Sequence, residues 1–340
     1  MGPLLFEPFF RPQIWGGRRL ETILGKRLPP GRQYGESWEL SAHPLHISQV
    51  RNPEFAGQDL ASLWSRSSQD LWGRQPGMPD HFPWLLKFLD CNDYLSIQVH
   101  PDETIARQLS PSEHRKDEVW VIVSAEPEAK VFVGLQPDVK PDDLRRAIVN
   151  GDLTSCLNVF SPRPGDVCHI PPGTVHSAGG GVVIAEVQTS SDATYRLYDW
   201  QRLGSDGLPR PLHIEEAFRA IHWGAQSSRL VNPEPQLRSP GWESQIVAST
   251  PDFHIELWQV APATEVEISF TKMMTVMVLG GMVTLETNSS PSIILPMGET
   301  VLIPACVKSC LWSTSAESPA RLLVCSPPEE IMPGGSSGVI

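Results

Sequence analysis

The sequence predicts a mainly β protein built from two β-barrels with a few short helices. The chain has 340 residues, of which 33 are proline and 26 glycine. Proline at this frequency disfavours long helical bundles and favours short strands joined by turns. From residue 84 onward, short apolar runs bounded by turn residues recur, which is typical of buried strands. A spacing repeated in the two halves of the chain then indicates two barrels of one type.

The elements follow in order along the chain. Residues 1–83 are irregular in pattern and predict an arm with strands that packs on the barrels. The predicted strands are 84–89, 94–99, 119–123, 130–134, 166–170, 182–187, 253–260, 266–270, 275–279, 282–287, 300–303 and 320–325. Helical patterns occur at 104–109, 141–148 and 214–221, the second with proline and acids in its first turn. We therefore predict a first barrel at 84–224, a linker at 225–242, a second barrel at 243–330 and a tail at 331–340.

The repeat links a glycine, a proline after five intervening residues, and a third position five places after the proline. These positions are Gly165, Pro171 and His176 in the first half, and Gly298, Pro304 and Ser309 in the second. Upstream, the strand at 119–123 parallels the strand at 275–279, so that Glu118 corresponds to Met274. Only the first barrel keeps polar, metal-type residues. We expect it to carry the chemistry and the second barrel to be structural.

The charge balance limits the classes of partner. The chain has 27 Lys and Arg against 39 Asp and Glu, a formal net charge of −12. This balance disfavours binding to nucleic acids or anionic membranes in general, so any small anionic substrate needs a local basic cluster. The N-terminus lacks a signal-peptide pattern, and no apolar run is long enough to span a membrane. Six scattered cysteines without a CxxC pair predict reduced thiols in the cytoplasm.

Four residues form a candidate metal site. Gln98 and His100 alternate along one predicted strand, so both side chains face the same side. Glu118 and His176 come from two other strands or strand ends. A single buried histidine is usually only hydrogen-bonded, but the glycine–proline–histidine frame is a metal-barrel signature. Two imidazoles, a carboxylate and an amide oxygen suit Zn²⁺, and less selectively Mn²⁺, Fe²⁺ or Co²⁺.

Longer motifs carry a more specific resemblance. The matching segments are 35–39 (GESWE), 83–90 (PWLLKFLD), 95–102 (LSIQVHPD), 116–120 (KDEVW), 172–177 (PGTVHS) and 188–200 (QTSSDATYRLYDW). Together they resemble the type I mannose-6-phosphate isomerases of the cupin superfamily, in their short bacterial form. The resemblance runs from about residue 5 to 325 and implies a double cupin fold, that is, two jelly-roll barrels. One departure is Arg115, where longer members of the family often carry histidine.

The resemblance assigns roles to individual residues. It implies one Zn²⁺ ion per chain on Gln98, His100, Glu118 and His176, with Arg196 over the active site. It implies phosphate contacts from Ser96, Lys87 and Arg202, and it adds the carboxylates Glu186 and Asp192. Lys116 precedes Glu118 by two residues, so it is expected on the same face, beside the metal.

The implied reaction interconverts mannose 6-phosphate and fructose 6-phosphate through an enediol, which needs a base and charge stabilisation at C1 and C2. The base stays open among Lys116, Glu186, Asp192 and a metal-bound hydroxide. One alternative is another sugar-phosphate cupin isomerase or epimerase. A second is a sugar-phosphate-binding cupin without catalysis, which loss of Lys116 or Arg196 would have favoured. Monomer and homodimer also both stay open.

Overall fold

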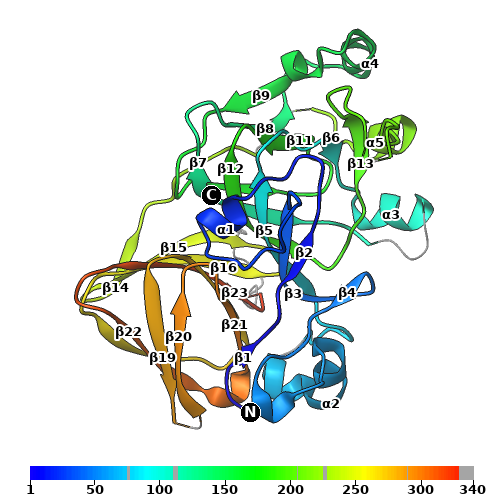
Figure 1. The fold of residues 1–340 in the computed structure, drawn as a ribbon. Helices are drawn as coiled ribbons and strands as arrows, with labels where there is room; N and C mark the ends of the chain where they lie inside the picture. Colours follow the sequence, from blue (N-terminus) through cyan, green and yellow to red (C-terminus); the bar gives the residue numbers. More distant parts are fainter. Residues whose placement is uncertain (75–76, 110–113, 205, 225–227, 289, 329–340) are drawn as a thin grey trace, which may run out of the picture.

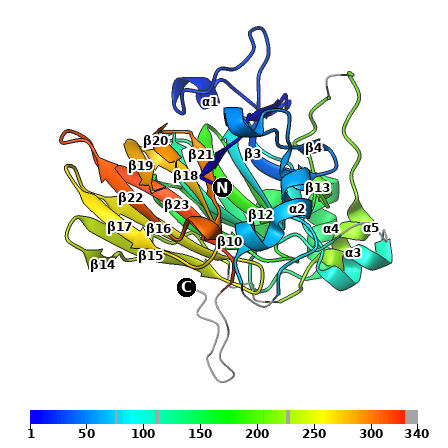
Figure 2. The same ribbon diagram turned by 90° about the horizontal axis from the view of Figure 1, so that it is seen from below.

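The computed structural model describes residues 1–340 except 75–76, 110–113, 205, 225–227, 289 and 329–340. Two barrels lie side by side (Figure 1). Helices α3, α4 and α5 lie at the end of the first barrel that is remote from the second, and the view from below agrees (Figure 2). The mainly β prediction is confirmed.

The first barrel consists of two sheets. The larger has the order β10 (Val167–Ile170), β7 (Glu118–Ala125), β12 (Val182–Thr189), β5 (Trp84–Cys91), β3 (Glu36–His43) and β2 (Phe9–Arg11), with β4 (His46–Ile47) paired to β3. The smaller has the order β13 (Tyr195–Tyr198), β6 (Ile97–Val99), β11 (His176–Gly179), β8 (Lys130–Leu135) and β9 (Leu157–Phe160). All pairings in both sheets are antiparallel.

The second barrel repeats this arrangement. Its larger sheet has the order β1 (Leu4–Leu5), β21 (Thr300–Ile303), β18 (Met274–Gly280), β23 (Ala320–Ser326), β16 (His254–Val260), β15 (Trp242–Ser249) and β14 (Gln236–Ser239). Its smaller sheet has the order β17 (Glu265–Ser269), β22 (Ser309–Thr314), β19 (Met282–Thr287) and β20 (Ser290–Pro296). The N-terminal arm therefore contributes strands to both barrels, β1 to the second and β2 to β4 to the first.

Short helices connect the strands. They are α1 (Arg19–Thr22), α2 (Leu60–Trp72), α3 (Glu103–Leu109), α4 (Pro141–Asn150) and α5 (Ile214–Ala220), with 3₁₀ turns at Pro53–Phe55, Leu153–Cys156 and Ala305–Val307. The helical patterns expected at 104–109, 141–148 and 214–221 correspond to α3, α4 and α5. Helix α2 lies in the arm that the sequence pattern left irregular. The Asp59 side chain caps it by accepting from the Ser62 backbone N–H at 2.7 Å.

The central strands are apolar on both faces because each face is buried. Along β12, Val183, Ala185 and Val187 join the core between the barrels, which also contains residues of β16, β18 and β23. The alternate residues Val182 and Ile184 point into the first barrel. Strand side chains alternate between faces, so a strand covered on both sides reads as a continuous apolar run. The continuous apolar runs in the sequence therefore predicted these strands.

The glycine of the repeat has a backbone function in both barrels. Gly165 and Gly298 precede β10 and β21, and their φ angles are +96° and +88°. A residue with a Cβ is strained at such angles, whereas glycine adopts them freely. Each glycine thus forms the turn that starts the strand leading to His176 or to Ser309. The repeat in the sequence corresponds to one turn built twice.

The linker expected at 225–242 needs correction. Val231 pairs with Val167 of the first barrel, and residues 236–239 form β14, a strand of the second barrel's larger sheet. A short edge strand next to the Gly241 turn has little apolar content, so composition alone did not reveal it. The tail at 331–340 lies outside the described residues, and the other domain boundaries stay predictions.

No helix of the described part combines the length and the apolar content needed to cross a membrane. The cytoplasmic location and the monomer or homodimer state stay predictions.

Candidate active site

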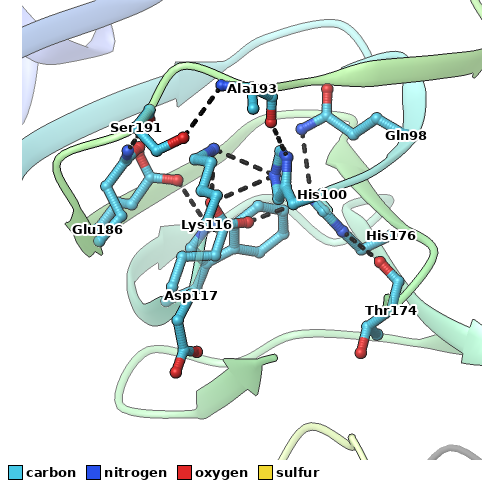
Figure 3. Close-up of polar contacts among 12 residues, drawn as sticks. Gln98, His100, Lys116, Asp117, Thr174, His176, Glu186, Ser191 and Ala193 are labelled. Atoms are coloured by element: carbon cyan, nitrogen blue, oxygen red, sulfur yellow. Dashed lines mark hydrogen bonds and ion pairs between the residues drawn. The ribbon is translucent and has the colours of Figure 1, made fainter. Parts of the chain in front are cut away.

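The two sheets of the first barrel bring the metal-type residues together around the start of β7. Glu118 is the first residue of β7, His176 is the first of β11, and His100 directly follows β6. The pairing of β11 with β6 sets His176 opposite Gln98. His100, Glu118 and His176 are at most 1% exposed, and ligand atoms of the three lie within 4.8 Å of one another. Figure 3 shows the two imidazoles and the Gln98 amide turned toward one another.

Both histidines are held in the form that a metal ion requires. His100 donates its Nδ1–H to the Ala193 carbonyl at 2.7 Å, and His176 donates its Nδ1–H to the Thr174 carbonyl at 2.9 Å. The Nε2 lone pairs therefore face the Glu118 carboxylate, at 3.5 and 3.1 Å. Burial, together with the Lys116 ammonium, lowers the pKa of His100 to about 3, so its imidazole is neutral. A backbone acceptor on Nδ1 is the usual support of a metal-binding histidine.

The Gln98 amide is suited to a fourth ligand position. Its Nε2 lies 3.2 Å from His176 Nε2, and its Oε1 accepts a hydrogen bond from the Ser96 hydroxyl at 3.1 Å. Turning the amide by 180° preserves the bond to Ser96, because a hydroxyl also accepts. The amide oxygen then faces His176 Nε2 and the shared centre.

The charge of Glu118 completes a donor set for a divalent cation. Burial alone would raise the pKa of the Glu118 carboxyl, but the Lys116 ammonium holds it well below its usual range. An ionised carboxylate between two imidazoles fits Zn²⁺ and related divalent ions. The described residues thus contain a cluster able to hold one metal ion.

Lys116 lies at the edge of this cluster, as the two-residue spacing predicts. Its ammonium is 2.7 Å from Glu118 Oε2 and 3.1 Å from His100 Nε2. The next residue, Asp117, points away from the cluster (Figure 3) and pairs with His169 at 2.8 Å. This pair holds His169 at Asp117 and not at the cluster.

A cavity of about 480 Å³ opens beside the cluster. Its size is in the range of small-molecule sites. The lining includes Gln98, Lys116, Glu186, Asp192 and Arg196. All four residues expected to take part in catalysis therefore face one space, together with a candidate metal ligand.

Lys87 and Glu186 form a buried pair in the cavity wall. The Lys87 ammonium lies 3.1 Å from Glu186 and donates to Gln188 Oε1 at 2.7 Å. Glu186 also accepts from Trp120 Nε1 at 3.0 Å. Burial raises the pKa of Glu186. Burial lowers the pKa of Lys87, but the carboxylates of Glu186, Glu36 and Asp192 together outweigh it and raise that pKa. Lys87 lines the cavity, but its charge is already balanced by a carboxylate.

The other expected phosphate contacts differ in position. Ser96 lines the cavity, but Arg202 is not among its lining residues. The Arg202 guanidinium instead pairs with Asp199 at 2.7 Å and with Asp93 at 3.2 Å. A second arginine on Asp199, Arg210, lines the cavity.

Sequence reasoning missed two groups of cavity residues. The first comes from the arm and comprises Arg11, Gln13, Trp15 and Glu36. The second follows β13 and comprises Arg210 and His213. A signal existed for the first group, because Glu36 belongs to the motif at 35–39 that carries the family resemblance. The Arg210-x2-His213 pair before α5 had no recognisable spacing.

Comparisons with known proteins agree with this geometry. The model of the type I phosphomannose isomerase catalytic domain matches residues 4–131. A mannose-6-phosphate isomerase of Streptococcus mutans is 33% identical over 309 residues, which cover 90% of this chain and 94% of that protein. A mannose-6-phosphate isomerase of Bacillus subtilis is 36% identical over 64% of this chain and 68% of its own length.

A crystal structure of the mannose 6-phosphate isomerase from Bacillus subtilis has the same fold. It superposes with a TM-score of 0.84 at 29% identity, covering 96% of this chain and 99% of that one. The agreement extends over both barrels and the arm, so the two proteins share the double cupin architecture. With the identity to the streptococcal relative over nearly the full length of both proteins, it leads to one conclusion: the chain belongs to the type I mannose-6-phosphate isomerase family.

Proposed function

We propose that this chain is a zinc-dependent isomerase that interconverts mannose 6-phosphate and fructose 6-phosphate through an enediol intermediate. One observation carries the proposal: two imidazoles and a carboxylate meet beside a lysine, at the wall of a cavity that an arginine also lines. The names of the bacterial relatives supply the substrate pair.

The residues that would hold the zinc ion are His100, Glu118 and His176, with the Gln98 amide oxygen as the fourth ligand. When bound, zinc supplies a Lewis acid that stabilises negative charge on the sugar oxygens at C1 and C2. The donor set also accepts Mn²⁺, Fe²⁺ or Co²⁺. The identity of the ion is therefore part of the proposal and needs a measurement.

Side chains of the cavity wall perform the proton transfer in this proposal. A proton must move between C1 and C2, so a group able to take it up and return it must face the sugar. Lys116 and Asp192 both line the cavity. Glu186 lines it too, but its carboxylate is held by Lys87 and Trp120. We assign the proton transfer to Lys116 or Asp192. We assign to Glu186 a positioning role, in which it holds the side chains of Lys87 and Trp120 in the cavity wall.

Arg196 is assigned to the substrate's charge. It pairs with Gln98 across β13 and β6, so its side chain starts beside a proposed zinc ligand. Its Nε is buried and has no hydrogen-bond partner among the described residues. A partly buried guanidinium that faces a cavity and has an N–H without a protein acceptor attracts anionic groups of a substrate. Ser96, which lines the same cavity, keeps its assignment as a phosphate contact.

The test is a coupled assay that converts mannose 6-phosphate to fructose 6-phosphate. Zinc-loaded protein should turn over, dialysis against a chelator should remove more than about nine-tenths of the activity, and added Zn²⁺ should restore it. Elemental analysis should find one zinc per chain before dialysis. Glucose 6-phosphate serves as the competing substrate. Turnover of that sugar alone would indicate another isomerase, and no turnover by zinc-loaded protein would refute the enzyme proposal.

A further inference from the structure

We propose that the side-chain hydroxyl of Thr189 positions Lys116 for the reaction by holding the two peptide groups that flank this lysine. The inference rests on the proposed function and adds a positioning residue to it. Thr189 is the last residue of β12. It is not among the residues that line the cavity, so it acts through Lys116 and not on the substrate.

One oxygen atom contacts both sides of the lysine. Thr189 Oγ1 donates to the Arg115 carbonyl at 3.1 Å and accepts from the Asp117 N–H at 3.1 Å. A hydroxyl can donate one hydrogen bond and accept another at the same time. The Arg115 carbonyl belongs to the peptide group before Lys116, and the Asp117 N–H belongs to the peptide group after it. Because peptide groups are planar, fixing both of them restrains the two backbone dihedral angles of Lys116.

These contacts lie beyond the regular part of the sheet. The pairing of β12 with β7 ends where Gln188 lies opposite Glu118. One further backbone bond follows, from the Thr189 N–H to the Asp117 carbonyl at 3.0 Å. Lys116 lies one residue further on, outside the paired part of β7. The Thr189 hydroxyl therefore continues the attachment between the two segments past the end of the strand pairing.

The position of the Lys116 ammonium depends on this backbone. Lys116 is 5% exposed, and its ammonium lies 2.7 Å from Glu118 and 3.1 Å from His100. A buried side chain has little room to compensate for a displaced backbone by changing its rotamer. A displacement of about 1 Å can reduce the rate of a reaction about 100-fold. Loss of the Thr189 hydroxyl should therefore lower the rate of the chemical step more than the affinity for the substrate.

Ser191 provides a contrast, because its hydroxyl is connected to the metal cluster. It accepts from the Ala193 N–H at 3.3 Å, and the Ala193 carbonyl accepts from His100 (Figure 3). A change at Ser191 would therefore also disturb a proposed zinc ligand. Among the described residues, the Thr189 hydroxyl bonds only to the two peptide groups beside Lys116. A change at Thr189 thus separates the positioning of the lysine from the binding of the metal.

The experiment compares Thr189→Val, which removes the hydroxyl but keeps the branched shape, with Thr189→Ser, which keeps the hydroxyl. In the coupled assay with mannose 6-phosphate, Thr189→Val should lower kcat about 10-fold or more and change KM less than about threefold. Thr189→Ser should restore kcat to within about threefold of the wild-type value. Elemental analysis should find the wild-type zinc content in both variants.

A second readout does not depend on activity. The Asp117 N–H loses its acceptor in Thr189→Val, so its hydrogen exchange, measured by NMR, should become about 10-fold faster or more. Thr189→Ser should keep the wild-type exchange rate at this amide.

Thr314 of β22 supplies a matched control in the second barrel. Its hydroxyl donates to the Ala261 carbonyl at 2.6 Å and accepts from the Thr264 N–H at 3.1 Å. Thr314→Val therefore loses the same two kinds of hydrogen bond, at a residue that does not line the cavity. It should lower the melting temperature by an amount similar to that of Thr189→Val and leave kcat and KM unchanged.

Three results would overturn the inference. The first is a kcat within about twofold of the wild-type value in zinc-loaded Thr189→Val. The second is an equal loss of kcat in Thr189→Val and Thr189→Ser, which would mean that the hydroxyl is not the responsible group. The third is unchanged hydrogen exchange at the Asp117 amide in Thr189→Val. If the wild-type protein has no isomerase activity, the proposed function fails, and the exchange measurement still tests separately whether Thr189 holds the segment of Lys116.

Discussion

The two barrels share a topology but differ in what fills them. The strand order β10-β7-β12-β5 of the first barrel corresponds to β21-β18-β23-β16 of the second, and β6-β11-β8-β9 corresponds to β17-β22-β19-β20. The register supports the equivalence, because His176 lies opposite Gln98 and Ser309 lies opposite Ser269. The same backbone frame thus surrounds a polar cavity in one half and an apolar core in the other.

The difference is concentrated at a few equivalent positions. Glu118 begins β7, whereas Met274 begins β18 and packs in a core with Trp258 and Trp312. Along β12, Glu186 lies opposite Trp120, while the second barrel has Val324 opposite Val276. Buried charges lower stability unless each has a partner, and in the first barrel they have partners. The comparison teaches that side chains must fill the interior of each barrel. Apolar side chains fill it where function does not require charged ones.

Replacing His176 by the second barrel's serine should have the largest effect. His176→Ser removes an imidazole from the proposed zinc set, so the metal content should fall to less than about 0.1 per chain. The value of kcat/KM should fall on the order of 10³-fold or more. Elemental analysis and the coupled assay measure both. Ser309→Ala, the matched change in the second barrel, should leave both within about twofold. A His176→Ser protein with full metal content would contradict the ligand assignment.

The reverse exchange should destabilise the second barrel without creating a site. Met274→Glu places an unpaired carboxylate in an apolar core, which costs about 3 kcal/mol or more of unfolding free energy at neutral pH. Burial would raise the pKa of that carboxyl above its unfolded value, so the loss should grow as pH rises and shrink as pH falls.

Urea unfolding of Met274→Glu measures the loss, with Met274→Leu as the control at less than about 1.5 kcal/mol. Unchanged stability of Met274→Glu at neutral pH would mean that this position is not part of a packed interior. Zinc binding and activity in the first barrel should stay at the wild-type level in the folded fraction. A second zinc ion per chain would contradict the view that the second barrel lacks a metal site.

Sequence reasoning predicted the proposed metal cluster because its members have local signatures. Gln98 and His100 alternate on one strand, and His176 follows the strand that starts at the Gly165 turn, where the backbone needs a positive φ. Such features depend on neighbours in the chain, so spacing alone is informative. Helix α2 was missed although Leu60, Leu63 and Trp64 follow a helical period, because prolines and polar residues surround it.

The arginine that lines the cavity was harder to predict because its position depends on tertiary contacts. Arg202 and Arg210 lie in the same loop, and both pair with Asp199. Their order in the sequence does not reveal which one reaches the cavity. The bonds between His213 and Arg196 decide it, and they join a loop end to a strand 17 residues earlier. No periodicity in the sequence encodes such a contact.

The smallest expected effect tests whether the second barrel supports the site. Asp252, just before β16, pairs with Arg115, whose neighbour Lys116 contacts Glu118. Asp252→Asn should lower kcat about threefold by loosening the segment that holds Lys116. Because the pair is partly exposed, the loss of unfolding free energy should be at most about 1 kcal/mol.

A matched control separates positioning from stability in this test. Glu299→Gln breaks the Arg51–Glu299 pair, which has similar exposure and joins the arm to the second barrel, but neither residue lines the cavity. It should change stability by a similar amount and leave kcat unchanged. If Asp252→Asn leaves kcat and its pH profile at the wild-type values, the second barrel does not position Lys116 through this pair. A lower kcat in Asp252→Asn alone would mean that the barrel without metal-type residues still contributes to the chemistry of its neighbour, by fixing the segment that carries the lysine.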